Sequence, residues 1–388
     1  MTPAAKPGAG DGRSVADAAL ARVARMARAR RAMGERGVEV LLCSLGADLP
    51  WLTGYEAMPL ERPTVLVLPA DDTATLVVPG LEAPRVREDP TLFELRPWSD
   101  GEDAVEIVAG LVGRRTRLAV SDRSWAALLL GLQAARPSAT WCTTSSVLGG
   151  LRAVKDAAEI AVLTAAAEAA DRVAAALLAG EVPLLGRSET EVAADLSARL
   201  VAEGHARVDF AIVASGPNAA SPHHEPTSRR IDPGEAVVCD FGGTFRIGDE
   251  PGYCSDTTRT VVTGEPPAGL AELYSVLQAA QAAAVAAVAP GIACEEIDLT
   301  ARRIIVEAGH GEHFIHRTGH GIGMEVHEDP YIVEGNSTPV EAGHAFSVEP
   351  GIYLPGRFGA RIEDIVVATS DGVLPLNRTD HSLHAVEA

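Results

Sequence analysis

The chain has 388 residues, of which 47% are hydrophobic and 22% charged, as in an ordinary folded globular protein. Its formal net charge of -20 argues against nucleic acid as a partner, because phosphate groups would be repelled. Five cysteines, an odd number without a CxxC pair, argue against a disulfide framework or a zinc knuckle, so we expect free thiols.

The N-terminal residues, MTPAAKPGAGDGRS, are small and polar and lack the apolar segment of a secretion signal. We therefore expect residues 1–14 to form a disordered tail and the protein to reside in the reducing cytoplasm. A helix is predicted from Ala16 to about Arg36. Its pattern predicts that Leu20, Val23 and Ala27 face inward and that most of its arginines face solvent.

Short apolar segments bounded by turn residues follow this helix and predict a small sheet. The predicted strands cover residues 38–45, 64–70, 73–80 and 115–122, and helical patterns cover residues 102–113 and 124–135. This alternation predicts an α/β domain over residues 15–148. The composition changes at VLGGL, where Gly149–Gly150 is the expected linker.

Residues 151–388 show a different pattern of predicted elements. A long alanine-rich helix is predicted first, over residues 155–179. Further helices at 188–204 and 270–288 alternate with strands at 211–215, 236–241, 255–263, 345–349 and 361–368. Short loops rich in Gly and Pro favour antiparallel pairing, so this half is predicted to be α+β. Apolar stretches such as Val173–Ala179 are too short to span a bilayer, and no membrane partner is expected.

Two acidic residues flank a predicted turn in AVVCDFGGTFRIGDEPGYCSDTTRT, residues 236–260. Asp240 lies on the first strand, and Asp256 lies on the strand that returns after Gly248–Gly252. An antiparallel hairpin can place these two side chains next to each other.

A second pair occurs in HAFSVEPGIYLPGRFGARIEDIVV, residues 344–367. Glu349 ends one strand, two Pro-Gly turns follow, and Glu363 is expected on a returning strand. A single acid in a strand usually faces solvent. All four acids, however, lie in apolar or glycine-rich segments beside sharp turns, and four buried carboxylates would repel one another unless protonated or bound to cations.

The segment HRTGHGIGMEVHEDP, residues 316–330, supplies imidazole groups and glycines. It lacks the lysine and spacing of a phosphate-binding loop, and it has no HExxH motif of a zinc protease. His320 lies between two glycines, which permit close approach of the backbone. Two divalent cations would balance the four carboxylates, and the neutral imidazole of His320 would complete their coordination.

The ordered set of acids with His320 resembles the metal site of the pita-bread metallopeptidases, a family that includes methionine aminopeptidase, aminopeptidase P and prolidase. The segments GYCSDTTRT, HRTGHGIGMEVHE, SVEPGIY and RIEDIVV are most similar to the aminopeptidase P and prolidase branch. LPWLTGYE, residues 49–56, resembles a loop of the creatinase-like domain of that branch. The resemblance implies a creatinase-like α/β domain at 15–148 and a pita-bread α+β catalytic domain at 151–388.

The resemblance also assigns the metal ligands. It implies that Asp240 chelates one metal ion and that Asp256 and Glu363 bridge both ions. His320 and Glu349 would complete the second ion, and Glu349 would also transfer the proton of the attacking water.

Three further residues receive roles from the same resemblance. His327 would contact the scissile carbonyl, His223 in SGPNAASPHHEP would flank the substrate, and Arg361 would hold a ligand carboxylate. His224 follows directly, and sequence alone does not decide which of the two histidines faces the site; motif position favours His223. The loop between Asp240 and Asp256 is longer than is usual in the family, with RIGDE as the expected insertion.

The activity implied is metal-assisted hydrolysis of the bond between an N-terminal residue and proline. The implied cofactors are two divalent ions, with manganese favoured and cobalt, iron or zinc as alternatives. The substrate would be a short peptide with proline second, cut by a dipeptidase or by an aminopeptidase, and relatives suggest a homodimer. The competing hypotheses are a creatinase-like amidinohydrolase or lyase on a small non-peptide substrate, and a non-catalytic binding module on the same fold.

Overall fold

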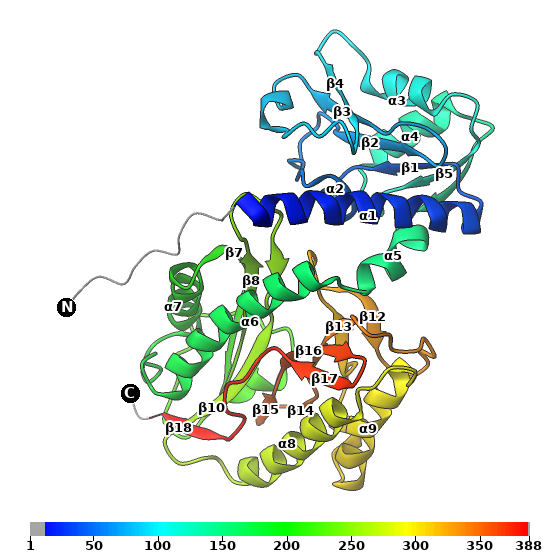
Figure 1. Ribbon diagram of the computed structural model, residues 1–388. Coiled ribbons are helices and arrows are strands. Elements are labelled where there is room, and N and C mark those ends of the chain that lie inside the picture. Colours follow the sequence, from blue (N-terminus) through cyan, green and yellow to red (C-terminus); the bar gives the residue numbers. More distant parts are fainter. Residues whose placement is uncertain (1–11, 387–388) are drawn as a thin grey trace. The chain divides into compact units, whose positions relative to one another are not determined.

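A computed structural model describes residues 12–386, which divide into two compact units (Figure 1). The first unit extends to Arg152 and also includes Ile247–Pro251; the second comprises Ala153–Arg246 and the residues from Gly252 onward. Residues 1–11 of the expected tail lie outside the described residues. Helix α1, Gly12–Arg36, includes the last three residues of that expected tail.

The N-terminal unit contains a six-stranded mixed sheet in the order β4-β3-β2-β1-β5-β6. The strands are β1 Val40–Cys43, β2 Val65–Pro69, β3 Thr75–Pro79, β4 Glu94–Trp98, β5 Arg117–Val120 and β6 Thr140–Thr143. Helices α3, Ala104–Val112, and α4, Ala126–Ala135, share an apolar core with this sheet. The predicted α/β class is confirmed. Strands β4 and β6, which were not predicted, occupy the two edges and expose much of their surface, so they lack the apolar runs of the central strands.

The predicted inward face of α1 is wrong. Leu20 and Val23 are 68% and 41% exposed, whereas Arg25 is only 7% exposed and the inward positions include Ala29 and Met33. The Arg25 guanidinium lies 5.4 Å from the centre of the Trp51 ring, in helix α2, Asp48–Thr53. Arginine can bury its long side chain against an aromatic ring, so charge alone does not mark the solvent face of a helix.

The expected linker at Gly149–Gly150 is also wrong, because both glycines lie inside helix α5, Ser145–Ala153. The division between the two units follows Arg152. Helix α6, Ala157–Leu178, begins just afterwards and is capped by Asp156, whose carboxylate accepts the backbone N–H groups of Ala158 and Glu159.

The C-terminal unit contains two larger sheets and a two-stranded ribbon. One sheet has the order β18-β10-β8-β7, with β9 paired to β8; the other has the order β12-β11-β13-β16-β17; the ribbon is β14-β15. Apart from the parallel pair β10–β18, their described pairings are antiparallel. The α+β prediction is confirmed. The strands are β7 His205–Ser215, β8 Ala236–Phe245, β9 Tyr253–Cys254, β10 Thr257–Thr263, β11 Gly319–Gly321, β12 Glu328–Ile332, β13 Ala345–Val348, β14 Gly351–Leu354, β15 Phe358–Arg361, β16 Asp364–Thr369, β17 Gly372–Pro375 and β18 His384–Val386.

Helices pack against both larger sheets of this unit. Helix α6 and helix α7, Glu189–Ala202, share a core with β7, β8 and β10. Helices α8, Leu270–Ala287, and α9, Cys294–Glu307, lie side by side (Figure 1) and share a core with β13 and β16. Among the described residues, α8 is the one helix long and apolar enough to cross a membrane, but its buried residues belong to this core, which accounts for its composition.

A single bridge between Thr258 and Glu363 connects the β8–β10 region with the start of β16. The Glu363 N–H donates to the carbonyl of Thr258 at 3.2 Å. Acidic residues from both sheets therefore approach one another at this point.

Candidate metal centre

A cavity of about 700 Å³ opens in the C-terminal unit where its two larger sheets meet. Its volume is in the range of small-molecule sites. Its wall combines acids, imidazoles and arginines: Asp209, His223, Asp240, Asp256, His316, Arg317, His320, His327, Glu349, Arg361 and Glu363, with Phe210, Ile212, Pro222 and Val326 as the remaining lining residues. All eight residues predicted to form the site line this one cavity.

Five of these residues form what we call the carboxylate–histidine cluster: Asp240, Asp256, His320, Glu349 and Glu363. One potential ligand atom from each of Asp256, His320 and Glu363 lies within 4.8 Å of the other two, and all three residues are buried. His320 Nε2 lies 3.2 Å from Glu349 Oε1 and 3.6 Å from Asp256 Oδ2. The residues that the sequence singled out for metal binding are therefore brought together in space.

The first acidic pair comes from the β8–β10 hairpin. Asp240 on β8 lies opposite Thr258 on β10, so the predicted pairing of these segments occurs. Asp256 occupies the short break between β9 and β10 rather than a continuous strand. Because of this break, β9 pairs with the C-terminal end of β8, whereas β10 pairs with residues 236–241 of β8.

The second acidic pair differs from the expected simple hairpin. Strand β13 pairs with β16, placing Val348 opposite Asp364, while the intervening residues form the separate β14–β15 ribbon. Glu349 and Glu363 thus lie where the chain leaves one sheet for the ribbon and returns. The expectation that Glu363 lies on a strand is wrong, because it forms only the isolated bridge to Thr258.

The glycines around His320 are required by close backbone contacts. A Cβ atom on Gly319 would lie 1.8 Å from the Ser347 carbonyl oxygen, and one on Gly321 would lie 2.1 Å from the Asp329 carbonyl oxygen. Neither distance is physically possible without displacement of the backbone. The His320 N–H donates to Ser347 Oγ at 3.0 Å. These contacts hold β11 close to its neighbours and direct His320 toward the acids.

Burial and mutual repulsion make the acids of the cluster unfavourable as bare carboxylates. Burial, then the charges of Glu363 and Asp240, raise the pKa of Asp256 well above its ordinary range. Burial, then the charges of Glu349 and Asp240, do the same for the pKa of Glu363. The Oδ1 atom of Asp240 is buried without a hydrogen-bond partner in the part of the chain that the structure describes. This donor set, oxygen-rich with one imidazole, fits divalent cations.

Glu349 behaves differently from the other acids. Burial raises its pKa, but its hydrogen bond to His320 and the charges of His320, His316 and Arg361 outweigh burial and lower the pKa to about 2. Ser347 Oγ donates to its Oε1 atom at 3.0 Å. Its side chain keeps 15% of its surface exposed, so an ionised carboxylate remains accessible from the cavity.

Arg361 lies beside the cluster as expected. Its guanidinium donates to Asp240 Oδ2, to Thr258 Oγ1 at 3.0 Å and to Tyr353 Oη at 2.9 Å. His316 Nε2 lies 2.9 Å from the same tyrosine oxygen. A chain of polar contacts thus extends from His316 through Tyr353 and Arg361 to Asp240.

His327 lies at the rim of the cluster. Its ring centre is 4.1 Å from that of His320, in an edge-to-face arrangement. Burial, then the charges of His320 and Arg317, lower its pKa to about 4. The imidazole is therefore neutral at physiological pH and can donate one hydrogen bond without carrying a charge.

The structure distinguishes the two adjacent histidines. His224 Nε2 lies 2.8 Å from Glu189 Oε2, at the start of α7, whereas His223 lines the cavity. Glu189 is fully buried and also accepts hydrogen bonds from Ser215, Asn218 and Thr227. These contacts hold the segment that carries His223, which agrees with the preference for His223.

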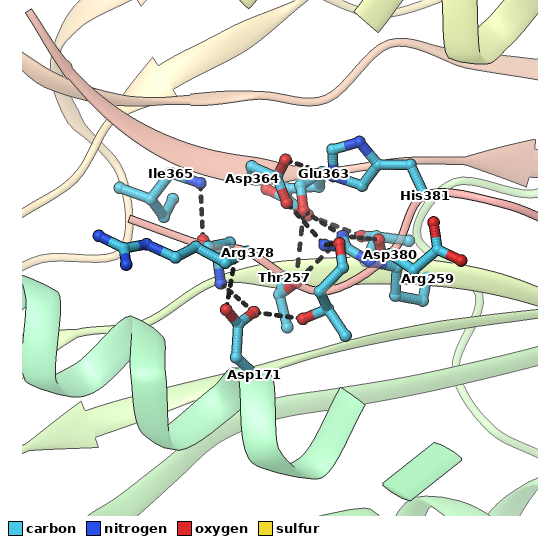
Figure 2. A network of polar contacts seen from close by, with 12 residues as sticks. Asp171, Thr257, Arg259, Glu363, Asp364, Ile365, Arg378, Asp380 and His381 are labelled. Atoms are coloured by element: carbon cyan, nitrogen blue, oxygen red, sulfur yellow. Dashed lines mark hydrogen bonds and ion pairs between the residues drawn. The ribbon is translucent and has the colours of Figure 1, made fainter. Parts of the chain in front are cut away.

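A polar network surrounds the backbone at Glu363 (Figure 2). Arg259, fully buried on β10, donates to the Glu363 carbonyl at 2.8 Å and to Asp364 Oδ1 at 2.8 Å. Asp364 Oδ2 lies 2.6 Å from His381 Nε2. These contacts hold the Glu363 carbonyl and the Asp364 side chain in place.

The same network includes the C-terminal segment and helix α6 (Figure 2). Arg259 donates to the Thr379 carbonyl at 3.1 Å. Asp171 of α6 accepts the Asn377 side-chain amide at 3.0 Å, the Arg378 N–H at 2.5 Å and the Thr379 hydroxyl at 2.5 Å. Residues 377–381 thus connect helix α6 with β16, the strand that follows Glu363.

Besides four apolar lining residues, the polar residues Asp209, His316, Arg317 and Tyr353 of the site were not predicted from the sequence, the last belonging to the site through its contact with Arg361. His316 and Arg317 lie within the segment HRTGHGIGMEVHEDP and Tyr353 lies within SVEPGIY, so their positions in these motifs were an available signal. Asp209 had no such signal, because it lies outside every motif.

Comparison with known proteins identifies the family. Residues 161–370 match Metallopeptidase family M24, and residues 25–154 match the Creatinase/Prolidase N-terminal domain. The chain belongs to metallopeptidase family M24, with a creatinase-type domain before the pita-bread catalytic domain. The resemblance inferred from the motifs is confirmed, and family membership implies divalent metal ions, which the carboxylate–histidine cluster fits.

Individual relatives match the chain over nearly its full length. "Probable dipeptidase PepE" of Mycobacterium bovis is 44% identical and covers 93% of this chain and 96% of its own length. "Xaa-Pro dipeptidase" of Lactobacillus delbrueckii subsp. lactis is 36% identical, covering 90% and 95% respectively. The crystal structure of dipeptidase PepE from Mycobacterium ulcerans superposes with a TM-score of 0.87 at 45% identity, covering 96% of this chain and 99% of that one.

Proposed function

We propose that this chain is a metal-dependent exopeptidase that hydrolyses the bond between an N-terminal residue and proline, with dipeptides as its main substrates. The observation that carries the proposal is the carboxylate–histidine cluster on the wall of a cavity that also contains His223 and His327. The names of the relatives, dipeptidase and Xaa-Pro dipeptidase, support the substrate class.

Two divalent cations, with manganese first and cobalt, iron or zinc as alternatives, are the proposed cofactors. Asp240 would hold one cation, Asp256 and Glu363 would bridge both, and His320 and Glu349 would complete the second. Four carboxylates and two dications balance in formal charge, which supports two ions rather than one. Oxygen ligands with one imidazole favour manganese over metals that prefer thiolates.

The cations, when bound, would polarise the scissile carbonyl and lower the pKa of a water molecule. The residues of the chain would then perform the proton transfers. The carboxylate of Glu349 would accept a proton from the attacking water and deliver it to the leaving nitrogen. The neutral His327 donates its ring N–H to the carbonyl oxygen as negative charge develops there. His223 contacts the substrate from the facing loop.

A creatinase-like amidinohydrolase or lyase, and a non-catalytic binding module, are not favoured. Such repurposed forms of the fold would be expected to lack part of the metal cluster, and all five candidate ligands are present and adjacent. No observation in the described residues points to a non-peptide substrate.

Localisation and assembly belong to the same proposal. A cytoplasmic location is supported by the free cysteines, none of which is in a disulfide in the described residues. We propose a homodimer because members of the family commonly dimerise. Analytical ultracentrifugation tests this proposal. A sedimentation coefficient that corresponds to one chain at micromolar concentration would contradict the dimer.

Hydrolysis of a peptide panel tests the activity. Xaa-Pro dipeptides, longer Xaa-Pro peptides and dipeptides without proline would be incubated with the chelated protein and with protein supplied with manganese or cobalt. We expect metal-dependent release of the N-terminal residue, fastest from dipeptides, which also yield free proline. Equal cleavage of peptides without proline, or undiminished activity after chelation, would contradict the proposal.

The His327→Ala variant separates chemistry from metal binding. We expect a loss of kcat on the order of a hundredfold or more, because the donor at the carbonyl oxygen is removed, with unchanged metal content. Metal analysis by mass spectrometry beside the kinetics checks both. A variant that retains full turnover would remove His327 from the proposed mechanism.

A further inference from the structure

Two side chains with permanent positive charge line the cavity, Arg317 and Arg361. Arg361 is occupied by contacts within the protein: it donates to Asp240, Thr258 and Tyr353, and its Nη1 also donates to the Pro222 carbonyl at 3.2 Å. Arg361 is buried and belongs to the support of the cluster. It has little capacity left for a ligand.

Arg317 is in a different situation. It is partly buried, and its guanidinium carbon lies 4.6 Å from the centre of the Tyr331 ring. Within residues 12–386, its guanidinium has no ion pair or hydrogen bond to a protein acceptor. A cation–π contact with an aromatic ring does not use the N–H donors of the guanidinium as hydrogen-bond donors to an acceptor, so they remain available for a planar anion such as a carboxylate.

We infer that Arg317 binds the free carboxylate of the substrate and thereby selects dipeptides over longer peptides. This inference rests on the proposed function and deepens it, because it names the group of the protein that would recognise the end of the substrate. A guanidinium whose position is restricted by contact with the Tyr331 ring can form two parallel hydrogen bonds to one carboxylate.

The chemistry of the substrate fits this position. In an Xaa-Pro dipeptide the carboxylate is joined to the scissile nitrogen through one carbon atom, so its binding group must lie near the group at the scissile carbonyl. Arg317 and His327 line the same cavity, and Arg317 lies three residues before His320, whose ring centre is 4.1 Å from that of His327. The required neighbours are therefore present.

Recognition of the substrate carboxylate would account for a preference for dipeptides over longer peptides, which the cavity volume alone does not explain. A cavity of about 700 Å³ has room for more than a dipeptide, so volume alone would not exclude longer peptides. A longer peptide has a neutral amide where the dipeptide has its carboxylate. Arg317 would lose its charge-assisted bonds to such a substrate, and its desolvation would be uncompensated.

The alternative is that Arg317 only packs against Tyr331 and supports β12. Substrate pairs that differ in charge alone separate these roles. Kinetics on manganese-loaded enzyme would compare Ala-Pro with Ala-Pro amide, which has no carboxylate, for the wild type, Arg317→Ala and Arg317→Lys. The control is Arg303→Ala, which removes the same charge from an exposed position of α9.

We expect the wild type and Arg303→Ala to prefer Ala-Pro over its amide through KM. In Arg317→Ala the KM for Ala-Pro should rise on the order of tenfold to a hundredfold, while that for the amide and the metal content stay unchanged. Arg317→Lys should recover part of the preference, because it keeps the charge without the two parallel donors. An unchanged KM for Ala-Pro, or an equal rise for both substrates, would overturn the inference and leave the proposed hydrolysis intact.

A binding measurement tests the carboxylate site at Arg317 independently of the proposed hydrolysis. Calorimetric titration of the manganese-loaded wild type and Arg317→Ala with proline and with prolinamide needs no turnover. If the wild type cleaves no Xaa-Pro peptide but binds proline in preference to prolinamide, and Arg317→Ala loses this preference, the proposed function fails and Arg317 remains a carboxylate site. Equal binding of both ligands by the wild type would refute the inference about Arg317 itself.

Discussion

The ionised carboxylate of Asp256 destabilises the folded protein unless a cation is bound beside it. Burial and the neighbouring carboxylates Glu363 and Asp240 raise its pKa. In the variant Asp256→Asn one like charge is removed with little change in shape. We expect the chelator-treated variant to melt a few degrees above the wild type, roughly 1 kcal/mol, whereas added manganese no longer stabilises it.

Thermal denaturation with EDTA and with manganese measures both effects. The matched control is Asp209→Asn, which removes another acid of the cavity wall outside the metal cluster and should retain stabilisation by the metal. If Asp256→Asn binds manganese with wild-type affinity, Asp256 is not a bridging ligand.

Glu189 links stability to pH through a buried carboxylate outside the metal cluster. Burial raises its pKa, but hydrogen bonds from His224, Asn218, Ser215 and Thr227 outweigh burial and lower it from 4.5 to about 2. Because the folded-state pKa lies below the unfolded value, the stabilisation is complete above about pH 4.5 and is lost as pH falls toward 2. The contribution at stake is about 3 kcal/mol.

Urea denaturation of chelated protein between pH 5 and pH 3 measures this dependence. The variant Glu189→Gln should show a flatter decline of the free energy of unfolding than the wild type. Glu307→Gln, at the exposed end of α9, serves as control and should follow the wild type. Parallel curves for the wild type and Glu189→Gln would show that Glu189 is not the titrating group.

Single residues differ in how far the sequence could predict them. The four acids and the imidazole of the cluster were recognisable because each lies in a local motif of strand and turn residues. The choice between His223 and His224 was not decidable locally, because it depends on Glu189, which lies on a different element. Asp209, which lies outside every motif, acquires its position only when β7 reaches the cavity.

At the level of elements, β11 depends on glycines for its close packing. The variant Gly319→Ala would place a methyl group 1.8 Å from the Ser347 carbonyl oxygen, so β11 or β13 must move. We expect a loss of at least about 2 kcal/mol in the free energy of unfolding and weaker manganese binding, because His320 and Glu349 flank the displaced contact.

Chemical denaturation and metal titration check this prediction. The control is Gly110→Ala, inside helix α3, where an added Cβ meets no atom within 4 Å. Alanine there should be neutral or stabilise the protein by up to about 1 kcal/mol. Wild-type stability of Gly319→Ala would mean that the two strands are less closely packed than described.

The sequence predicted the central strands and most long helices better than the edge strands and the ends of strands. The strands β1, β2, β3 and β5 have continuous apolar runs, and the long helices have clear periodicity. The edge strands β4 and β6 do not, and the ends of β10 and β16 were misplaced because the chain breaks its strands at Asp256 and Glu363. Helix α9 was not predicted, although its buried residues Cys294, Ile297, Ala301 and Ile305 follow helical spacing.

For the whole molecule, the cysteines provide a global probe of folding. Cys142 is exposed, whereas Cys43, Cys239, Cys254 and Cys294 are buried. Burial raises the pKa of Cys239 to about 12 and that of Cys294 to about 11, which further suppresses their reactivity. We expect one thiol to react rapidly with a thiol reagent in the native protein and the remaining four to react only on unfolding.

Thiol titration in buffer and in denaturant measures this pattern, and Cys142→Ser should remove the fast phase. More than one fast thiol in the native wild type would indicate that one of the compact units opens readily.

The network of Arg259, Asp364 and Asp171 connects residues 377–381 with the segment that carries Glu363. A shortened protein that ends before Asn377 would lose the Thr379 carbonyl that receives Arg259, the His381 ring beside Asp364, and the groups that Asp171 accepts. Such a truncation would therefore weaken metal loading, although it removes none of the five candidate ligands.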